Sequence, residues 1–176
     1  MNPLWTEILG DLAGRECTGT GTFRMMPHEE FATGPATGSV EAVAGGYGLM
    51  VRYAWTHHTD GPQQGALLVS APEGDDLGVQ ATLLDSWHQK PGPMHLAGTY
   101  GAGKVEVAGT YMETWGWQID VDVSGESGAS ESSAGESGAA IRMVMRNVVP
   151  EEALALAPEG MEFEAGPYVV SEFLLS

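Results

Sequence analysis

The stretch 49–56 reads Leu-Met-Val-Arg-Tyr-Ala-Trp-Thr and alternates between two kinds of side chain. Every second residue is large and apolar or aromatic: Leu49, Val51, Tyr53 and Trp55. The residues between them include Arg52 and Thr56. Because successive side chains of a β-strand point to opposite faces, this period of two predicts a half-buried strand with its aromatic face in the core.

The same alternation extends outward from this strand over most of the chain. Glycine and proline interrupt it at intervals of about ten residues, which is typical of all-β proteins. We predict strands at 14–26, 38–43, 49–58, 65–71, 78–88, 94–100, 104–113, 116–123, 140–148 and 168–175. Short turns such as Asp60-Gly61 make sequential neighbours pair, so we expect an antiparallel up-and-down β-barrel of about 8–10 strands.

Three segments depart from the strand pattern. Apolar residues at helical spacing follow Asn2-Pro3 as far as Gly14 and predict a short N-terminal helix, and 150–157 reads as a helical turn. The segment 124–138 contains only Ser, Gly, Glu and Ala, so we expect a disordered acidic loop. The whole chain, 1–176, is otherwise predicted to form one barrel domain.

Composition excludes several classes of partner. Seven Lys and Arg stand against 24 Asp and Glu, giving a formal charge of −17, which repels phosphate backbones and anionic lipid. Cys17 is the one cysteine, and no apolar run is long enough for a membrane span. We therefore expect a soluble cytoplasmic protein that binds neither nucleic acid nor membrane.

The segment Gly98–Lys104 matches the first positions of a phosphate-binding loop. Val105 stands where that loop needs Ser or Thr for Mg²⁺, and a strand follows where it needs a helix N-terminus. We interpret the segment as a hairpin turn. No nucleophile motif appears elsewhere, so no catalytic residue is assigned.

The histidines carry no metal-binding spacing. His57 and His58 are consecutive on a predicted strand, so we expect them to point to opposite faces. A two-histidine site joining His88 and His95 across their hairpin is an alternative to solvated histidines at the barrel rim. No metal is assigned.

The segment Leu83–His88 is the most informative for function. Alternation places Asp85 and Trp87 on one face of the strand, with Ser86 and His88 on the other. If the Trp87 face is inward, Asp85 is a buried carboxylate that needs a partner. A structural ion pair with Arg142 or Arg52 is one explanation, and a group that binds a ligand is the other.

This segment also carries a resemblance to a known family. The motifs are Asp85-Ser-Trp-His88, Gly98-Thr99, Gly46-Tyr-Gly48, Arg52-Tyr53 and Trp115-Gly-Trp117. Together they resemble an uncharacterised bacterial domain family with a calycin-like barrel, and the similarity covers 12–150. The resemblance implies a fold and no established activity. The chain is more distantly similar to lipocalins and haem-binding nitrobindins, but 168–175 has no histidine for an axial haem ligand, so no cofactor is expected.

We hypothesise a non-enzymatic binding module that holds a small, largely apolar ligand inside the barrel. The candidate ligand-binding residues are Tyr53, Trp55, Asp85, Trp87, His88, Tyr111, Trp117 and Arg142. A barrel filled by its own side chains is the alternative for the interior. The alternative functions are an enzyme that uses Asp85 and His88 at the barrel mouth, and a structural protein. The structural protein would be a homodimer through one barrel face, with methionines as contacts: Met25, Met26, Met112, Met143 and Met145.

Overall fold

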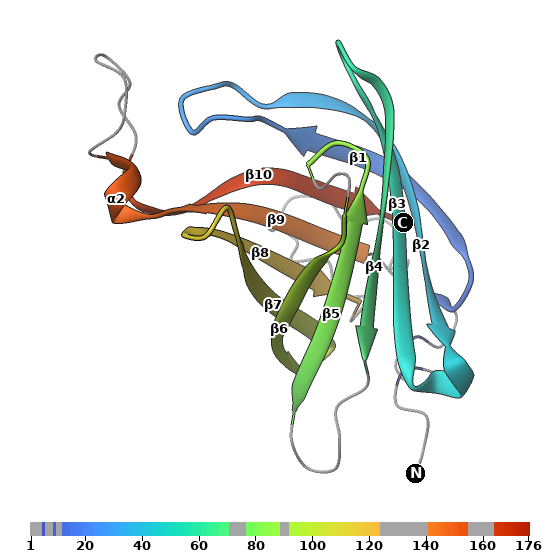
Figure 1. Ribbon diagram of the computed structural model, residues 1–176. Helices are drawn as coiled ribbons and strands as arrows, with labels where there is room; N and C mark the ends of the chain where they lie inside the picture. The colour runs from blue at the N-terminus through green and yellow to red at the C-terminus, as the bar shows by residue number, and fades with distance from the viewer. Residues whose placement is uncertain are drawn as a thin grey trace.

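The computed structural model describes Trp5, Leu9 and the ranges 12–70, 77–88, 92–123, 141–154 and 164–176. Ten strands make up most of it (Figure 1). They are β1 (Glu16–Phe23), β2 (Ala32–Val43), β3 (Gly48–His57), β4 (Gly61–Ser70), β5 (Gly78–Asp85), β6 (Met94–Gly101), β7 (Lys104–Tyr111), β8 (Trp115–Asp122), β9 (Ile141–Val149) and β10 (Gly166–Leu175). All the predicted strands are confirmed, with shifts at their ends.

The strands form one closed antiparallel barrel. Each strand pairs with the next along the chain, and β10 pairs with β1 in the register Gly19↔Leu175 to Phe23↔Ser171. Pairing of sequential strands follows from the short hairpin connections, and closure leaves no strand with an unpaired edge. The predicted up-and-down barrel is confirmed. Within it, Gly98–Lys104 forms the end of β6 and its turn into β7, as expected.

The core lies inside the barrel and follows the period-two pattern. Leu49, Val51, Tyr53 and Trp55 are all at most 4% exposed. The inward residues of β8 and β9, among them Ile119, Val121, Met143 and Met145, are buried as well. Trp5, Leu9 and Leu12 join this core from the N-terminal segment. Burial of this much apolar surface is the main stabilising contribution to the fold.

Helical structure is sparse. A 3-10 helix, η2 (Ala44–Gly46), joins β2 to β3. The α-helix with described bounds is α2, Glu151–Leu154, in the C-terminal part of the chain and within the predicted turn at 150–157. It does not lie at the N-terminus, where we also predicted a helix. Most of that N-terminal segment is outside the described residues, and its two described members, Trp5 and Leu9, are helical and buried. The predicted acidic loop, 124–138, is also outside the described residues.

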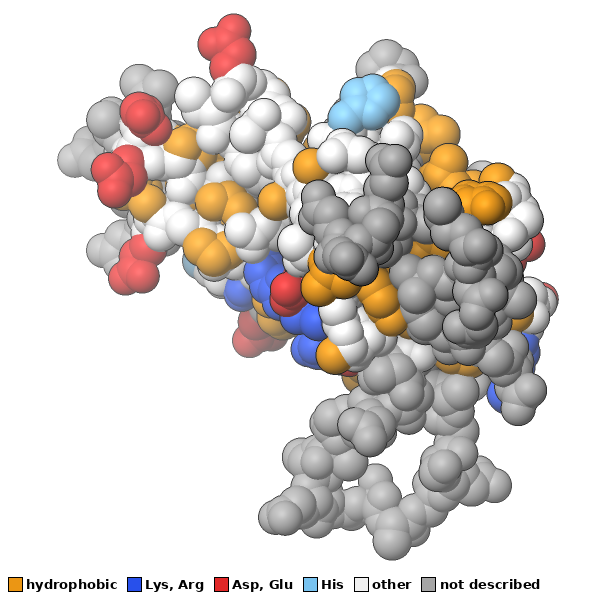
Figure 2. Space-filling view, turned by 90° about the horizontal axis from the view of Figure 1, so that it is seen from below, with side chains coloured by type: hydrophobic (Ala, Val, Ile, Leu, Met, Phe, Trp, Pro, Cys, Tyr) orange, Lys and Arg blue, Asp and Glu red, His pale blue; other side chains and the backbone are white. Residues whose placement is uncertain are grey.

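Most of the described charged side chains lie on the outer surface, where several cations stand beside carboxylates. Arg142 pairs with Glu172 at 2.8 Å and Arg146 with Asp120 at 2.8 Å, and Arg52 pairs with Glu41. Figure 2 shows basic and acidic side chains next to each other on one face. Exposed pairs of this kind contribute about 0–1 kcal/mol each, so they do not decide the fold.

Candidate functional site

A cavity of about 200 Å³ opens inside the barrel, at the end where β5 finishes and β6 begins. Its walls combine apolar side chains with a few polar ones. The lining residues are Met25, Leu83, Trp87, His88, Met94, Tyr111, Trp117, Asn147 and Val170. Trp87, His88, Tyr111 and Trp117 were predicted to bind a ligand, and the fold brings them together here. We call this hollow the mouth cavity.

Asp85 lies beside the mouth cavity as a buried carboxylate, 6% exposed. Its Oδ2 accepts a hydrogen bond from the Tyr53 hydroxyl at 2.5 Å. Its Oδ1 accepts the backbone N–H groups of Trp87 at 2.7 Å and His88 at 2.6 Å. The two backbone bonds form a side-chain turn of the kind that Asp favours, and they end β5 at this residue.

This turn corrects the prediction for His88. Alternation placed His88 on the outer face with Ser86, but the strand has already ended and the chain bends back toward the barrel axis. The His88 side chain is 11% exposed, and its ring centroid lies 4.2 Å from that of Trp87 and 5.0 Å from that of Trp117. His88 therefore faces the same cavity as Trp87.

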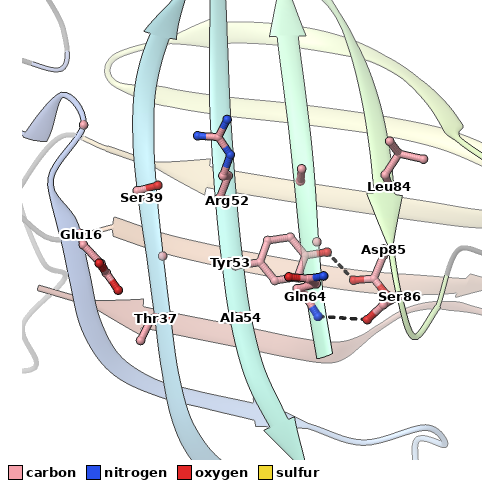
Figure 3. A pocket seen from close by; sticks show the side chains of 14 residues that line it. Glu16, Thr37, Ser39, Arg52, Tyr53, Ala54, Gln64, Leu84, Asp85 and Ser86 are labelled. Atoms are coloured by element: carbon pink, nitrogen blue, oxygen red, sulfur yellow. Dashed lines mark hydrogen bonds between the residues drawn. The ribbon is translucent and has the colours of Figure 1, made fainter. Parts of the chain in front are cut away.

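The hydrogen bond between Tyr53 and Asp85 depends on a glycine between them. Tyr53 is opposite Gly65 on β4, and Gly65 is opposite Asp85 on β5. A Cβ atom at Gly65 would lie 2.2 Å from the Tyr53 hydroxyl oxygen, so the ring lies directly across the glycine. Figure 3 shows Tyr53 reaching from β3 to Asp85 in this way. Cross-strand packing of an aromatic ring over glycine is a known stabilising device in sheets.

The partners predicted for Asp85 are wrong. Arg142 and Arg52 occupy outward positions of β9 and β3, because each lies between two buried neighbours on its strand. They pair with Glu172 and Glu41 on the outer surface. Arg142 is therefore not a ligand-binding residue of this site, and uncharged donors supply most of the contacts of Asp85.

The surroundings of Asp85 set its charge. Burial raises the pKa of its carboxyl, but the neighbouring His88 and the Tyr53 hydroxyl outweigh burial and hold the pKa below the ordinary 3.8. Burial and the charge of Asp85 together raise the pKa of Tyr53 well above 10.0. At neutral pH the pair is thus a carboxylate and a neutral phenol that donates to it.

Two side chains at the mouth cavity have buried nitrogen atoms without hydrogen-bond partners in the described part of the chain. They are Trp117, through Nε1, and His88, through both ring nitrogens. His88 Nδ1 lies 3.6 Å from Asp85 Oδ1, which is an ion-pair distance and too long for a hydrogen bond. A buried polar group left unpaired costs about 1–3 kcal/mol, and such groups occur where a ligand or water completes the bonding.

Other polar groups of the mouth cavity are already paired. Tyr111 donates to Asn147 Oδ1 at 2.7 Å, and Asn147 Nδ2 donates to the Tyr168 hydroxyl at 3.0 Å. Asn147 was missed from the sequence, although a signal was present. Asn147 shares the inward face of β9 with Ile141, Met143 and Met145. A polar side chain at an inward position indicates a hydrogen-bonding role inside the barrel.

Tyr53 and Trp55 are inward, as predicted, but they do not line the cavity. Trp55 packs in an aromatic cluster with Phe23, His57 and Trp87, with ring centroids 4.2–5.7 Å from its own. Trp87 is held in place by its Nε1, which donates to Asp60 Oδ2 at 2.8 Å. Tyr53 and Trp55 therefore support the residues that line the cavity.

The remaining histidines do not form a metal site. His57 and His58 were expected on opposite faces, but β3 ends at His57 and their ring centroids lie 4.5 Å apart. His95 is exposed on the outer face beside Thr82, away from the interior where His88 lies. Among the described residues, no group of three or more His, Cys, Asp or Glu side chains could hold a metal ion.

Larger hollows exist on the outside of the barrel. A groove of about 750 Å³ crosses β2 to β5, and its walls include outward polar side chains such as Ser39, Arg52 and Gln64 (Figure 3). These groups are reached by water, and Ser86 at the groove donates to Gln63 Oε1 at 2.7 Å. The mouth cavity is smaller, but it combines enclosure with unpaired buried nitrogen atoms.

Comparison with protein-family models and with curated proteins finds no match to this chain. In the described residues, no helix has the length and apolar character needed to cross a membrane. The functional interpretation therefore rests on the geometry of the mouth cavity.

Proposed function

We propose that this protein is a calycin-type binding module that holds a small, largely apolar ligand in the mouth cavity. One observation carries the proposal: an interior cavity with mostly apolar walls is lined by His88 and Trp117, whose buried ring nitrogen atoms lack partners among the described residues. Apolar walls with a few converging polar groups are the usual composition of a small-molecule site.

The size of the cavity limits the ligand. A cavity of about 150 Å³ in a protein core accommodates benzene, whereas drug-sized ligands occupy about 300–1,000 Å³. At about 200 Å³, the mouth cavity has room for one substituted ring. Fully buried side chains such as Leu67, Ile119 and Phe173 occupy the interior elsewhere, which disfavours a long lipid chain or a haem group.

An enzyme is the second candidate, and the pairing of His88 with Asp85 favours it. The ring of His88 lies between an ionised, buried carboxylate and the cavity, so it could take a proton from a bound molecule while Asp85 stabilises the resulting charge. This reading requires turnover of a bound compound. It fails if His88→Ala and Asp85→Asn leave the turnover of that compound unchanged.

Native mass spectrometry of the protein purified without added ligand tests the binding proposal. We expect a retained small-molecule mass that disappears in Val170→Phe, because Val170 lines the cavity and a phenyl ring would fill it. Arg142→Gln, on the outer surface, is the matched control and keeps the bound mass. The same spectrum tests the proposal of a homodimer.

A bare mass leads to a second measurement, in which single-ring compounds are titrated while tryptophan fluorescence is followed. Trp87 and Trp117 line the cavity, so occupancy changes their emission. A bare mass together with no saturable change for any such compound would reject the binding module. Circular dichroism of Val170→Phe shows whether the variant is folded.

A further inference from the structure

The polar groups of the mouth cavity define the chemistry of its ligand more narrowly than its size does. Trp117 presents an indole N–H, which can only donate a hydrogen bond. His88 presents a ring nitrogen whose role depends on which nitrogen carries the proton. The two rings are neighbours, with centroids 5.0 Å apart, and both line the cavity.

Asp85 selects the tautomer of His88. Its Oδ1 lies 3.6 Å from His88 Nδ1, and the carboxylate is ionised at neutral pH. A proton on Nδ1 is attracted by this charge, whereas a lone pair on Nδ1 would be repelled by it. A neutral imidazole at this position therefore carries its proton on Nδ1, and its Nε2 is an acceptor.

We infer that the mouth cavity binds a neutral single-ring compound bearing a hydroxyl group, of the phenol class. The hydroxyl donates its proton to His88 Nε2 and accepts the N–H of Trp117 Nε1. A hydroxyl is suited to this pair because one oxygen atom both donates and accepts. The inference rests on the proposed function, because it assigns a ligand to the same cavity.

Other substituents satisfy the cavity less well. An ether or ketone oxygen accepts from Trp117 but leaves His88 Nε2 without a donor. A carboxylate brings a negative charge next to Asp85, in a chain whose formal charge is already −17. A purely apolar ring leaves both nitrogen atoms unpaired, which a low-dielectric interior penalises.

A series of four probes of similar size tests the inference: phenol, anisole, toluene and benzoate. Binding of each to the full chain at neutral pH is measured by isothermal titration calorimetry. A neutral hydrogen bond contributes about 1 kcal/mol, so two bonds make phenol roughly tenfold or more tighter than toluene. Anisole, with one bond, falls between them, and benzoate is the weakest of the four.

Two variants assign the effect to atoms. Trp117→Phe removes the N–H and lowers phenol affinity about fivefold, with toluene affinity changed less than about twofold. Arg142→Gln is the control, because Arg142 pairs with Glu172 on the outer surface and does not line the cavity. It changes both affinities by less than about twofold.

The outcomes separate the two proposals. Toluene, anisole or benzoate binding as tightly as phenol overturns the hydroxyl assignment and leaves a binding cavity. Failure of all four probes to bind overturns the single-ring cavity and the assignment with it. The comparison of four probes on the unaltered protein remains decisive even if Trp117→Phe fails to fold.

Discussion

Replacing Gly65 by alanine should disrupt the link between β3 and β5. The new Cβ atom would lie 2.2 Å from both Cζ and the hydroxyl oxygen of Tyr53, so the ring must leave its position over the glycine. Displacement breaks the bond to Asp85, which at a charged acceptor contributes about 1.5–3 kcal/mol. Forcing a methyl group into a packed core adds about 1–3 kcal/mol.

Alanine also lowers the conformational entropy of the unfolded chain, which stabilises the folded state by about 0.4–1 kcal/mol. The net expected loss in the free energy of unfolding is therefore about 3 kcal/mol. Urea titration followed by tryptophan fluorescence measures it. Gly101→Ala is the matched control, because a Cβ atom there has no other atom within 4 Å. Only the restriction of the unfolded chain acts there, so this variant should be more stable than the unaltered protein by about 0.4–1 kcal/mol.

A double-mutant cycle tests whether the loss acts through Tyr53. In a Tyr53→Val background no ring lies over position 65, so Gly65→Ala should cost less than about 1 kcal/mol. An equal loss in both backgrounds, or a loss below about 1 kcal/mol in the unaltered protein, would show that the glycine is not required for the Tyr53–Asp85 bond.

Four further outcomes are expected. Asp85→Asn should lower the free energy of unfolding by about 2 kcal/mol at neutral pH. Because the pKa of Asp85 is lowered in the folded protein, its stabilising contribution is present above pH 3.8 and is lost as the pH falls through the folded pKa. Urea titrations at decreasing pH should therefore show a shrinking difference in stability between Asp85→Asn and the unaltered protein. Because the pKa of Tyr53 is raised in the folded protein, its contribution to the free energy of unfolding is present below pH 10.0 and is lost as the pH rises toward the folded pKa. In alkaline urea titrations, the difference in stability between the unaltered protein and Tyr53→Phe should therefore become smaller. Cys17 is fully buried, so a thiol reagent should label it at the rate of unfolding, and rapid labelling in native buffer would contradict the burial. Arg142→Gln removes an exposed pair with Glu172 and should change the stability by less than about 1 kcal/mol in thermal unfolding.

The sequence predicts the barrel well because its signals are local. Period-two alternation with regular glycine and proline interruptions requires no knowledge of distant contacts, and every strand it indicated is present. The start of β2 was missed: the strand begins at Ala32, whereas residue 38 was expected. The residues Thr33-Gly34-Pro35 have no apolar alternation, and they extend the strand by backbone pairing with β1.

The site is predictable only where strands remain regular. Burial of Asp85 and Trp117 followed from alternation and is confirmed. The position of His88 could not follow from it, because the Asp85 turn ends the strand three residues before His88. Val170 enters the cavity through a register shift between Val169 and Ser171, for which the sequence gives no signal. The partner of Asp85 was predicted wrongly because only positively charged side chains were considered. The observed partner is the uncharged hydroxyl of Tyr53, whose ring crosses Gly65 on the strand between them.

The seam between β1 and β10 has a consequence for synthesis in the cell. Thr18 and Ser176 exchange backbone hydrogen bonds at 3.0 and 3.2 Å, so the first strand finds its last neighbour only when β10 has been made. At 5–20 residues per second, the ribosome takes on the order of ten seconds to reach β10 after β1. During that interval the nascent sheet has an open edge on β1 that could pair with other chains. Chaperone engagement should therefore be strongest on chains stalled before Gly166, and it should fall once β10 emerges.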